Sequence, residues 1–250
     1  MYYRSIFNKF LIGLLFSGAF SLSLPLNAAM LDLWTNDGWS VLDAEDGTTP
    51  GGYVGPGWGG QDFDAEYLFY KQEGKQLSIG LQSGFDLLDG QQDFSGHTYY
   101  AGDLAIAFDG GAYDYAIDFG LVTRNIHNQN VGLGSGNQDA AGFYAVSQWN
   151  NDISFSSSSP FAMDEGSFLT GITGSSGSGL MSDGLSYYRI VTLDLDVLGY
   201  NASTFSAHWT MSCGNDVVEG TAKVPEPGSL VLLLGGLVSL IGGRYLRRRA

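Results

Sequence analysis

Apolar and polar residues alternate along the middle of this chain, and this period of two is the strongest constraint on its fold. In the run 113–119 the odd positions are Tyr, Tyr, Ile and Phe, while the even positions are Asp, Ala and Asp. Such alternation is typical of a strand that buries one face. No stretch of helical period has a useful length between residues 30 and 223. This part of the chain is therefore expected to be all-β.

Two pairs of alternating runs are joined by turns that contain glycine, which predicts two β-hairpins. The first covers 101–121 and turns at Asp109-Gly110-Gly111, where glycine accepts the positive φ angles of a tight turn. The second joins 65–71 to 76–82 through residues 72–75. Further strands are expected over 143–149, 187–195 and 204–213.

Composition supports strands and turns over helices. The chain has 37 glycines among 250 residues and 14% aromatic residues, and only 15% of its residues are charged, against about 25% in an average soluble chain. Short strands separated by Gly, Asn, Asp and Ser predict two antiparallel sheets packed face to face, a β-sandwich of jelly-roll or lectin-like type. A closed barrel is the alternative. Residues 37–60 and the Ser- and Gly-rich stretch 150–184 are expected to be irregular.

The N-terminus has the organisation of a secretory signal peptide. Arg4 and Lys9 precede an apolar run over 10–20, and small residues follow at Ala28 and Ala29. The alternative is a membrane anchor, but an apolar run of this length falls below the roughly 20 residues that span a bilayer. We expect residues 1–29 to be removed by the Sec and signal peptidase machinery.

The C-terminus combines a proline-rich motif, an uncharged segment and a basic end. Val224, Pro225, Glu226 and Pro227 precede the Leu- and Gly-rich run 228–243. As a helix this run measures about 24 Å, short for a hydrocarbon core of roughly 30 Å. The positive-inside rule keeps the following arginines in the cytoplasm and the body of the chain on the far side. This stop-transfer group is Arg244, Arg247, Arg248 and Arg249.

This order of Pro-Glu-Pro, short apolar helix and arginine cluster resembles the PEP-CTERM sorting signal of exosortase-processed bacterial surface proteins. The run 208–216 and the runs 102–106 and 113–117 are also similar to stretches of PEP-CTERM ectodomains. The resemblance implies that an exosortase recognises Pro225, Glu226 and Pro227 after transient anchoring in the inner membrane. The protein would then be released or re-attached at the surface of a Gram-negative cell. An ordinary C-terminal membrane anchor is the alternative.

The chain is therefore expected to comprise a signal peptide (1–29), a β-sandwich ectodomain (30–223) and a sorting signal (224–250). Six of its eleven basic residues lie within the first nine or last seven positions, which leaves five basic residues against 26 acidic ones. A surface this acidic repels polyphosphate, so nucleic-acid binding is not expected.

Acidic residues are the most plentiful polar groups, and two clusters of them are candidate calcium ligands. Calcium takes 6 to 8 oxygen ligands from carboxylates and carbonyls. The clusters are Asp62, Asp64 and Glu66, and Asp86, Asp89 and Asp93. Neither has the EF-hand pattern, and an Asp next to a Gly is also ordinary turn chemistry.

No catalytic motif is recognisable, so the chain is not expected to be an enzyme. His97, His127 and His208 are far apart and none has a metal-ligand spacing. A secreted carbohydrate-active hydrolase would need two carboxyl groups about 5 to 10 Å apart, and the sequence selects no pair. Cys213 falls on the apolar side of its run, which predicts a small buried residue rather than a reactive thiol.

Aromatic residues near predicted loops are candidates for a platform that stacks on sugar rings, although most aromatics of a β-sandwich are core residues. The candidates are Trp34, Trp39, Tyr53, Trp58, Tyr99 and Tyr100. Together with the tail, they favour a structural or adhesive protein of the cell surface or extracellular matrix that associates with exopolysaccharide.

Overall fold

The computed structural model describes residues 30–45, 54, 58–134, 136–182, 184–199 and 201–224. These residues form antiparallel β-sheets and short 3-10 turns, so the prediction of an all-β fold is confirmed. No helix among them is long and apolar enough to cross a membrane. Several features predicted from the sequence lie outside the described residues. They are the signal peptide, Tyr53, Pro225, Glu226, Pro227, the apolar run 228–243 and the arginines Arg244, Arg247, Arg248 and Arg249.

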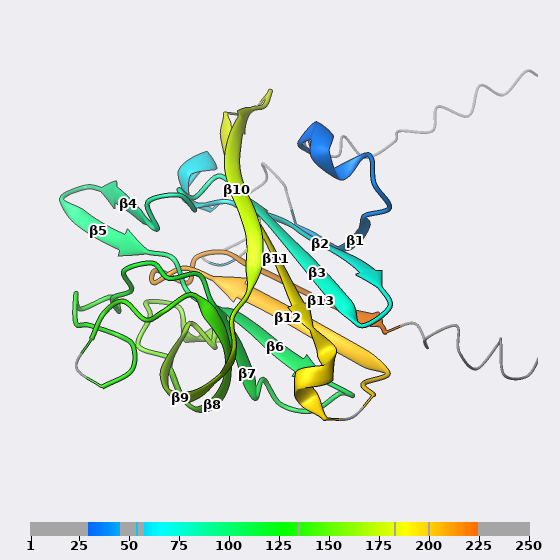
Figure 1. The fold of residues 1–250 in the computed structure, drawn as a ribbon. Helices are drawn as coiled ribbons and strands as arrows, with labels where there is room; N and C mark the ends of the chain where they lie inside the picture. The colour runs from blue at the N-terminus through cyan, green and yellow to red at the C-terminus, as the bar shows by residue number, and fades with distance from the viewer. Residues whose placement is uncertain are drawn as a thin grey trace, which may run out of the picture.

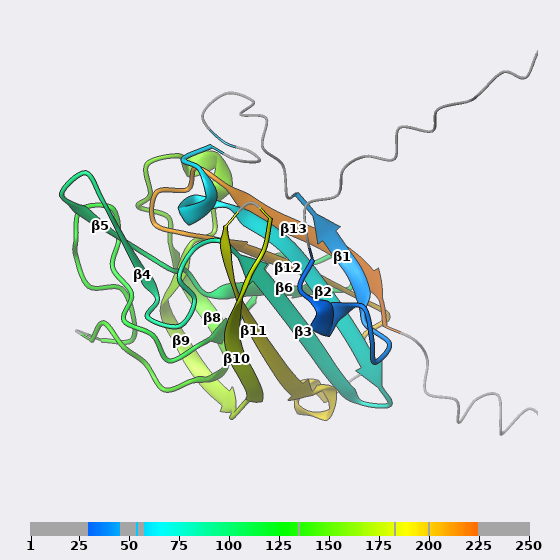
Figure 2. The same cartoon turned by 90° about the horizontal axis from the view of Figure 1, so that it is seen from above.

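Two sheets and one separate hairpin make up the fold (Figures 1 and 2). The five-stranded sheet has the order β1 (Ser40–Ala44), β2 (Ala65–Glu73), β3 (Gln76–Ser83), β11 (Leu185–Asp194) and β10 (Thr173–Leu180). The six-stranded sheet has the order β13 (Val217–Lys223), β12 (Thr204–Thr210), β6 (Leu104–Phe108), β7 (Tyr115–Asp118), β8 (Gly142–Asn150) and β9 (Ala162–Thr170). The hairpin consists of β4 (Gln91–Phe94) and β5 (His97–Tyr100).

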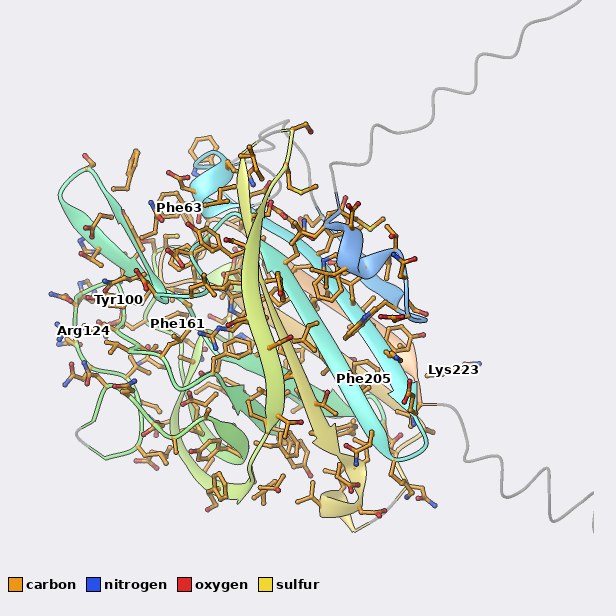
Figure 3. All side chains as sticks on the ribbon, turned by 45° about the horizontal axis from the view of Figure 1, so that its top comes forward. Phe63, Tyr100, Arg124, Phe161, Phe205 and Lys223 are labelled. Carbon is orange, nitrogen blue, oxygen red and sulfur yellow. The ribbon has the colours of Figure 1, made fainter. Side chains whose placement is uncertain are left out.

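The main core lies between the two sheets, which pack face to face. Leu77 and Ile79 of β3 share one buried cluster with Ile106 of β6 and with Phe205 and Trp209 of β12, and Figure 3 labels Phe205. All five side chains are at most 1% exposed. Removing this much apolar surface from water is the main stabilising contribution to such a fold.

Both predicted hairpins are confirmed. Strand β2 pairs antiparallel with β3 around Gly74, whose φ of 64° is in the left-handed region. Strand β6 pairs antiparallel with β7, and Asp109 and Gly110 turn the chain after β6 with φ angles of 54° and 72°. The three further predicted strands correspond to β8, β11 and β12.

The prediction that the run 113–119 buries only one face is wrong. Ala116 and Asp118, on the supposedly exposed side, are 0% and 6% exposed. A second apolar cluster covers this side, where Ala116 packs with Tyr144 and Met163 and with Leu133 of the long β7–β8 connection. Alternation along one strand does not show that a distant loop will cover its polar face.

The prediction that residues 150–184 are loops is also wrong, because this stretch contains β9 and β10. Strand β10 has the sequence TGSSGSGL and pairs with β11 over its full length. Backbone hydrogen bonds to a well-formed neighbour are available to any residue except proline, so an edge strand tolerates a sequence of low β-propensity. The stretch 37–60 likewise contains β1.

Candidate functional site

An aromatic cleft of ≈ 240 Å³ lies beside the β4–β5 hairpin. Its walls come from four separate parts of the chain: the loop that leads into β2, the hairpin, the connection between β8 and β9, and the turn after β12. The lining residues are Trp58, Gly59, Phe63, Phe94, Tyr99, Ser154, Phe155, Cys213 and Asn215. We refer to this site as the aromatic cleft.

Phe63 is the centre of the aromatic cleft and belongs to the 3-10 turn η2 (Gln61–Phe63). Its ring meets the rings of Phe94 and Tyr99 edge-on, with centroid distances of 5.8 and 5.3 Å. Edge-to-face packing of this kind is favourable for aromatic quadrupoles. Phe63, which Figure 3 labels, is 3% exposed whereas Phe94 is 58% exposed, so the cluster has a buried base and an open edge at Phe94.

Polar contacts hold the Trp58 side of the cleft to the turn after β12. The Asn215 side-chain amide donates to the backbone carbonyl of Trp58, and the Cys213 thiol donates to Asn215 Oδ1 over 2.7 Å. Gly59 has a φ of 96°, and a Cβ there would lie 2.6 Å from Asn215 Nδ2. Only glycine fits this conformation and this close approach.

The hairpin side of the cleft is tied to the same turn. Tyr100 N–H donates to Ser212 Oγ over 2.9 Å, and Ser212 N–H donates to the Tyr100 carbonyl over 2.8 Å. Ala101 forms an isolated bridge with Met211. Residues 211–216 therefore connect both walls of the cleft, and the rings keep a defined spacing.

Two of the six aromatic residues that the sequence suggested, Trp58 and Tyr99, line the cleft. Trp34 is instead 4% exposed and stacks on Phe69 at 4.3 Å. Trp39 packs edge-on against Trp34, and Tyr100 is 7% exposed. These three rings are structural. Sequence reasoning missed Phe63, Phe94 and Phe155, because nothing in the chain order shows that their loops meet.

Cys213 is buried at 7% exposure within the apolar core cluster, as its place in the alternation predicted. Burial raises the pKa of its thiol to about 12. Since the thiolate is the reactive form, this cysteine is unreactive near neutral pH. Burial also raises the pKa of Tyr99, so the cleft presents neutral groups.

The first candidate calcium cluster is divided between surface and interior. Asp62 is exposed, whereas Asp64 and Glu66 are 4% and 1% exposed. Glu66 accepts hydrogen bonds from Gln82 Nε2 over 2.5 Å and from Ser186 Oγ over 2.7 Å. These bonds link β2, β3 and β11 inside the five-stranded sheet and give Glu66 a structural role.

The second candidate cluster is engaged in local turn contacts. Asp86 Oδ1 accepts hydrogen bonds from the backbone N–H groups of Leu88 and Asp89, over 2.8 and 3.0 Å. Asp93 Oδ1 accepts one from Thr98 Oγ1 over 2.6 Å. Within the part of the chain that the structure describes, no three His, Cys, Asp or Glu side chains are grouped to hold a metal ion. Calcium binding stays a prediction.

Two further groups contain buried carboxyls, and of their members the sequence suggested only Asp64. Burial, together with the nearby Asp64 and Glu45, raises the pKa of Asp216 to about 9. Burial next to Asp118 raises the pKa of Asp103, and burial raises the pKa of Asp118 to about 6. None of these carboxyl groups lines the aromatic cleft.

No protein-family model, no curated protein and no solved structure matches this chain. The case for a function therefore depends on the chemistry of the chain's own residues.

Proposed function

We propose that this chain is an exported structural or adhesive protein of the bacterial surface or extracellular matrix, and that it associates with exopolysaccharide through the aromatic cleft. One observation carries the proposal: a cavity of ≈ 240 Å³ is lined by the exposed ring of Phe94 and the half-buried rings of Trp58 and Tyr99, and Asn215 and Ser154 line it too. We further propose that the sandwich is of jelly-roll or lectin-like type.

A sugar ring suits this chemistry. Pyranose rings present an apolar C–H face, which stacks on a flat aromatic side chain, and an edge of hydroxyls, which need hydrogen-bond partners. Drug-sized ligands occupy pockets of roughly 300–1,000 Å³. The smaller volume here is appropriate for one ring-sized group of a longer polymer.

Charge favours a neutral polysaccharide. Away from the two termini, five basic residues face 26 acidic ones, so an anionic polymer would be repelled at low salt. Lys and Arg are also absent from the described residues that line the cleft.

Export and sorting follow from the two ends of the chain. The order of Val224-Pro225-Glu226-Pro227, apolar run and arginine cluster is what supports exosortase processing after passage through the inner membrane. Intact-mass analysis of the surface-exposed protein is expected to show loss of the segment from about Gly228 onward. Retention of Arg244–Arg249 in the mature protein would contradict processing and favour a permanent membrane anchor.

The cleft is tested with the Phe94→Ala variant on a neutral glycan array, followed by calorimetric titration of the best-binding oligosaccharide. Phe94 is exposed and contacts Phe63 edge-on, so its removal is expected to lower the Tm by no more than about 4 °C. Glycan affinity is expected to fall about tenfold or more, equivalent to ~1.4 kcal/mol. The matched control is Leu180→Ala, which removes an apolar side chain that is 82% exposed on β10. Equal binding by wild type and Phe94→Ala would contradict the proposal.

The same preparation distinguishes a binding protein from a carbohydrate-active hydrolase. We expect no release of reducing ends from any bound polysaccharide. Turnover that disappears when one Asp or Glu is replaced would identify an enzyme instead.

A further inference from the structure

A second concavity, of ≈ 380 Å³, lies between the end of the β6–β7 connection, β8 and the β8–β9 connection, and shares no lining residue with the aromatic cleft. We refer to it as the Trp149 groove. Its lining residues are Ala112, Tyr113, Asp114, Val146, Ser147, Trp149, Asn151, Ser159 and Pro160. The volume is within the roughly 300–1,000 Å³ of small-molecule sites.

Trp149 presents a half-buried ring whose orientation is fixed. Its indole Nε1 donates a 2.6 Å hydrogen bond to the backbone carbonyl of Tyr113. Its ring also packs against the cluster formed by Ala116, Tyr144 and Met163. A ring held in this way loses little conformational freedom when a ligand stacks on its open face.

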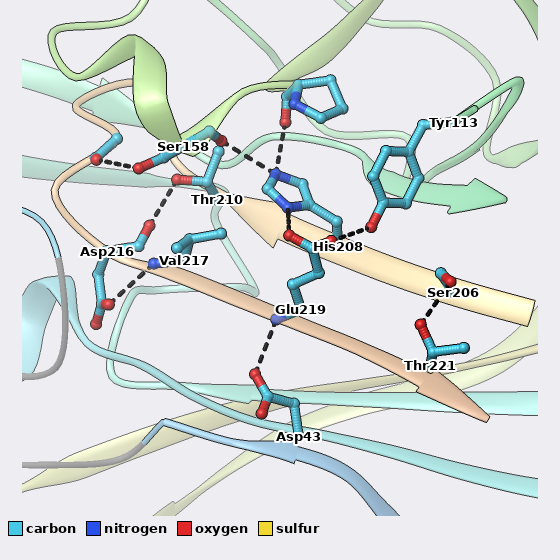
Figure 4. A network of polar contacts seen from close by, with 12 residues as sticks. Asp43, Tyr113, Ser158, Ser206, His208, Thr210, Asp216, Val217, Glu219 and Thr221 are labelled. Carbon is cyan, nitrogen blue, oxygen red and sulfur yellow. Dashed lines mark hydrogen bonds and ion pairs between the residues drawn. The ribbon is translucent and has the colours of Figure 1, made fainter. Parts of the chain in front are cut away.

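A network of polar contacts, shown in Figure 4, fixes the position of the Tyr113 side chain. Its hydroxyl donates to Glu219 Oε1 over 2.8 Å, and His208 Nδ1 lies 3.3 Å from Glu219 Oε2. His208 Nε2 lies 3.0 Å from the carbonyl oxygens of both Ser158 and Pro160. Both oxygens are acceptors, so this nitrogen is the donor. The network therefore connects Tyr113 on one wall of the groove to Pro160 on the other.

The polar groups among the described residues that line the groove are uncharged except for one carboxylate, and Ala112, Val146 and Pro160 add apolar surface. Asp114, Ser147 and Asn151 are exposed. The Oγ atom of Ser159 is buried and has no hydrogen-bond partner within the described part of the chain. One fixed aromatic face with hydroxyl, amide and carboxylate groups around it matches a sugar ring.

The geometry points to the Trp149 groove as a second sugar-binding subsite, which takes a neutral hexopyranose unit. Asn151 of the groove and Ser154 of the aromatic cleft are three residues apart, so their Cα atoms are at most about 11 Å apart. This short separation is what favours one polysaccharide chain that occupies both sites along the segment 151–160. The idea that one polysaccharide chain occupies both sites rests on the proposed function, whereas sugar binding in the groove depends only on the groove's own residues.

Two connected subsites predict that affinity increases strongly with the length of the oligosaccharide. Once one sugar unit is bound, binding of the same oligosaccharide at the second subsite is intramolecular. The probes are cellohexaose, maltohexaose and mannohexaose, each compared with its disaccharide by calorimetric titration of the full ectodomain. We expect at least one hexasaccharide to bind about tenfold or more tighter than its disaccharide. We also expect Trp149→Ala to lower hexasaccharide affinity about tenfold or more.

Trp149 is partly buried, so folding is checked by circular dichroism, and a second variant leaves the ring in place. Ser147→Ala combined with Asn151→Ala removes exposed polar groups of the groove and is expected to lower affinity at least threefold without changing the Tm. Trp149→Phe keeps an aromatic face and is expected to retain most of the binding. Leu180→Ala is the control at a distant surface.

The outcomes separate this inference from the proposed function. Loss of affinity in Phe94→Ala together with unchanged affinity in Trp149→Ala and in the Ser147→Ala, Asn151→Ala double variant would overturn the groove and leave the proposal for the aromatic cleft intact. Loss only in the groove variants supports the groove and contradicts the cleft. Failure of all three hexasaccharides to bind the wild-type protein would overturn both.

Discussion

The Oδ2 atom of Asp216 accepts a 2.9 Å hydrogen bond from the backbone N–H of Ala65, a residue 151 positions earlier in the chain. This contact ties the turn before β13 of the six-stranded sheet to the start of β2 in the five-stranded sheet. Asp216 is 0% exposed. Burial is the main reason that its pKa rises from 3.8 to about 9, and the pKa of the nearby Glu45 rises from 4.5 to about 7 for the same main reason.

These raised pKa values predict that the protein is most stable in mildly acidic solution. Above about pH 4 the folded state holds protons that the unfolded chain has released, on Glu45 up to about pH 7 and on Asp216 up to about pH 9. The free energy of unfolding therefore decreases as the pH rises through this window. We expect a lower Tm at pH 8.5 than at pH 5 in scanning calorimetry. A Tm that rises steadily across this window would contradict the assignment.

Glu45→Gln is the matched variant for this pH effect, because Glu45 is only half-buried and glutamine keeps its shape. The substitution removes one titrating group and one negative charge next to Asp43 and Asp64. We expect a shallower fall of Tm between pH 5 and 8, and a Tm at pH 8 that is higher than wild type by about 2 °C or more. An identical slope would show that Glu45 does not contribute.

The Cys213 thiol is expected to be unreactive in the folded protein. Its pKa of about 12 leaves almost no thiolate at pH 8. A chromogenic disulfide reagent should modify less than about a tenth of the protein in the time that modifies all of it in urea. Rapid modification without denaturant would refute the burial of this side chain.

Replacement of Cys213 also separates its packing from its hydrogen bond to Asn215. Cys213→Ala loses the donor and is expected to lower the free energy of unfolding by about 1 kcal/mol. Cys213→Ser keeps a donor and should be less destabilised than Cys213→Ala. Urea denaturation of both variants gives the comparison.

Gly80 is expected to be intolerant of any side chain. A Cβ at this position of β3 would lie 2.4 Å from two carbon atoms of the Trp34 ring. Trp34 cannot move freely, because its Nε1 donates to Gln82 Oε1 over 2.7 Å. Gly80→Ala should therefore lower the free energy of unfolding by about 1–3 kcal/mol, the usual cost of overpacking.

Gly171→Ala is the control for Gly80→Ala. A Cβ at Gly171, between β9 and β10, meets no atom within 4 Å. Its Tm is expected to stay within about 1 °C of wild type. Equal destabilisation of both variants would mean that the effect at Gly80 does not come from contact with Trp34.

The calcium hypothesis makes a direct prediction about stability. Binding to the folded state by either acidic cluster would raise the Tm with added calcium and lower it with a chelator. Asp62→Asn and Asp89→Asn, both at exposed positions, would then each test one cluster. An identical Tm in excess calcium and in chelator would end the hypothesis.

Sequence alone was sufficient for the all-β class, for both hairpins and for the inward-facing position of Cys213. These features depend on neighbours in the chain: alternation sets which face a side chain occupies, and glycine sets where a turn can form. The expectations for the two ends of the chain also come from local patterns, and they concern residues outside the described part. The Gly- and Ser-rich strand β10 was missed because its stability comes from pairing with β11 rather than from its own residues.

Tertiary structure decided where the candidate sites are. Phe63, Phe94 and Phe155 come from a 3-10 turn, a hairpin strand and a connection that are far apart in the chain, and their walls meet at the turn 211–216. Burial of Asp118 and Asp216, and the raised pKa values that follow from it, likewise depend on segments far away in the chain. Local sequence restricts the conformation of each segment, whereas a cleft or a shifted pKa results from which segments exclude water from one another, and that is settled only when the sheets and loops pack.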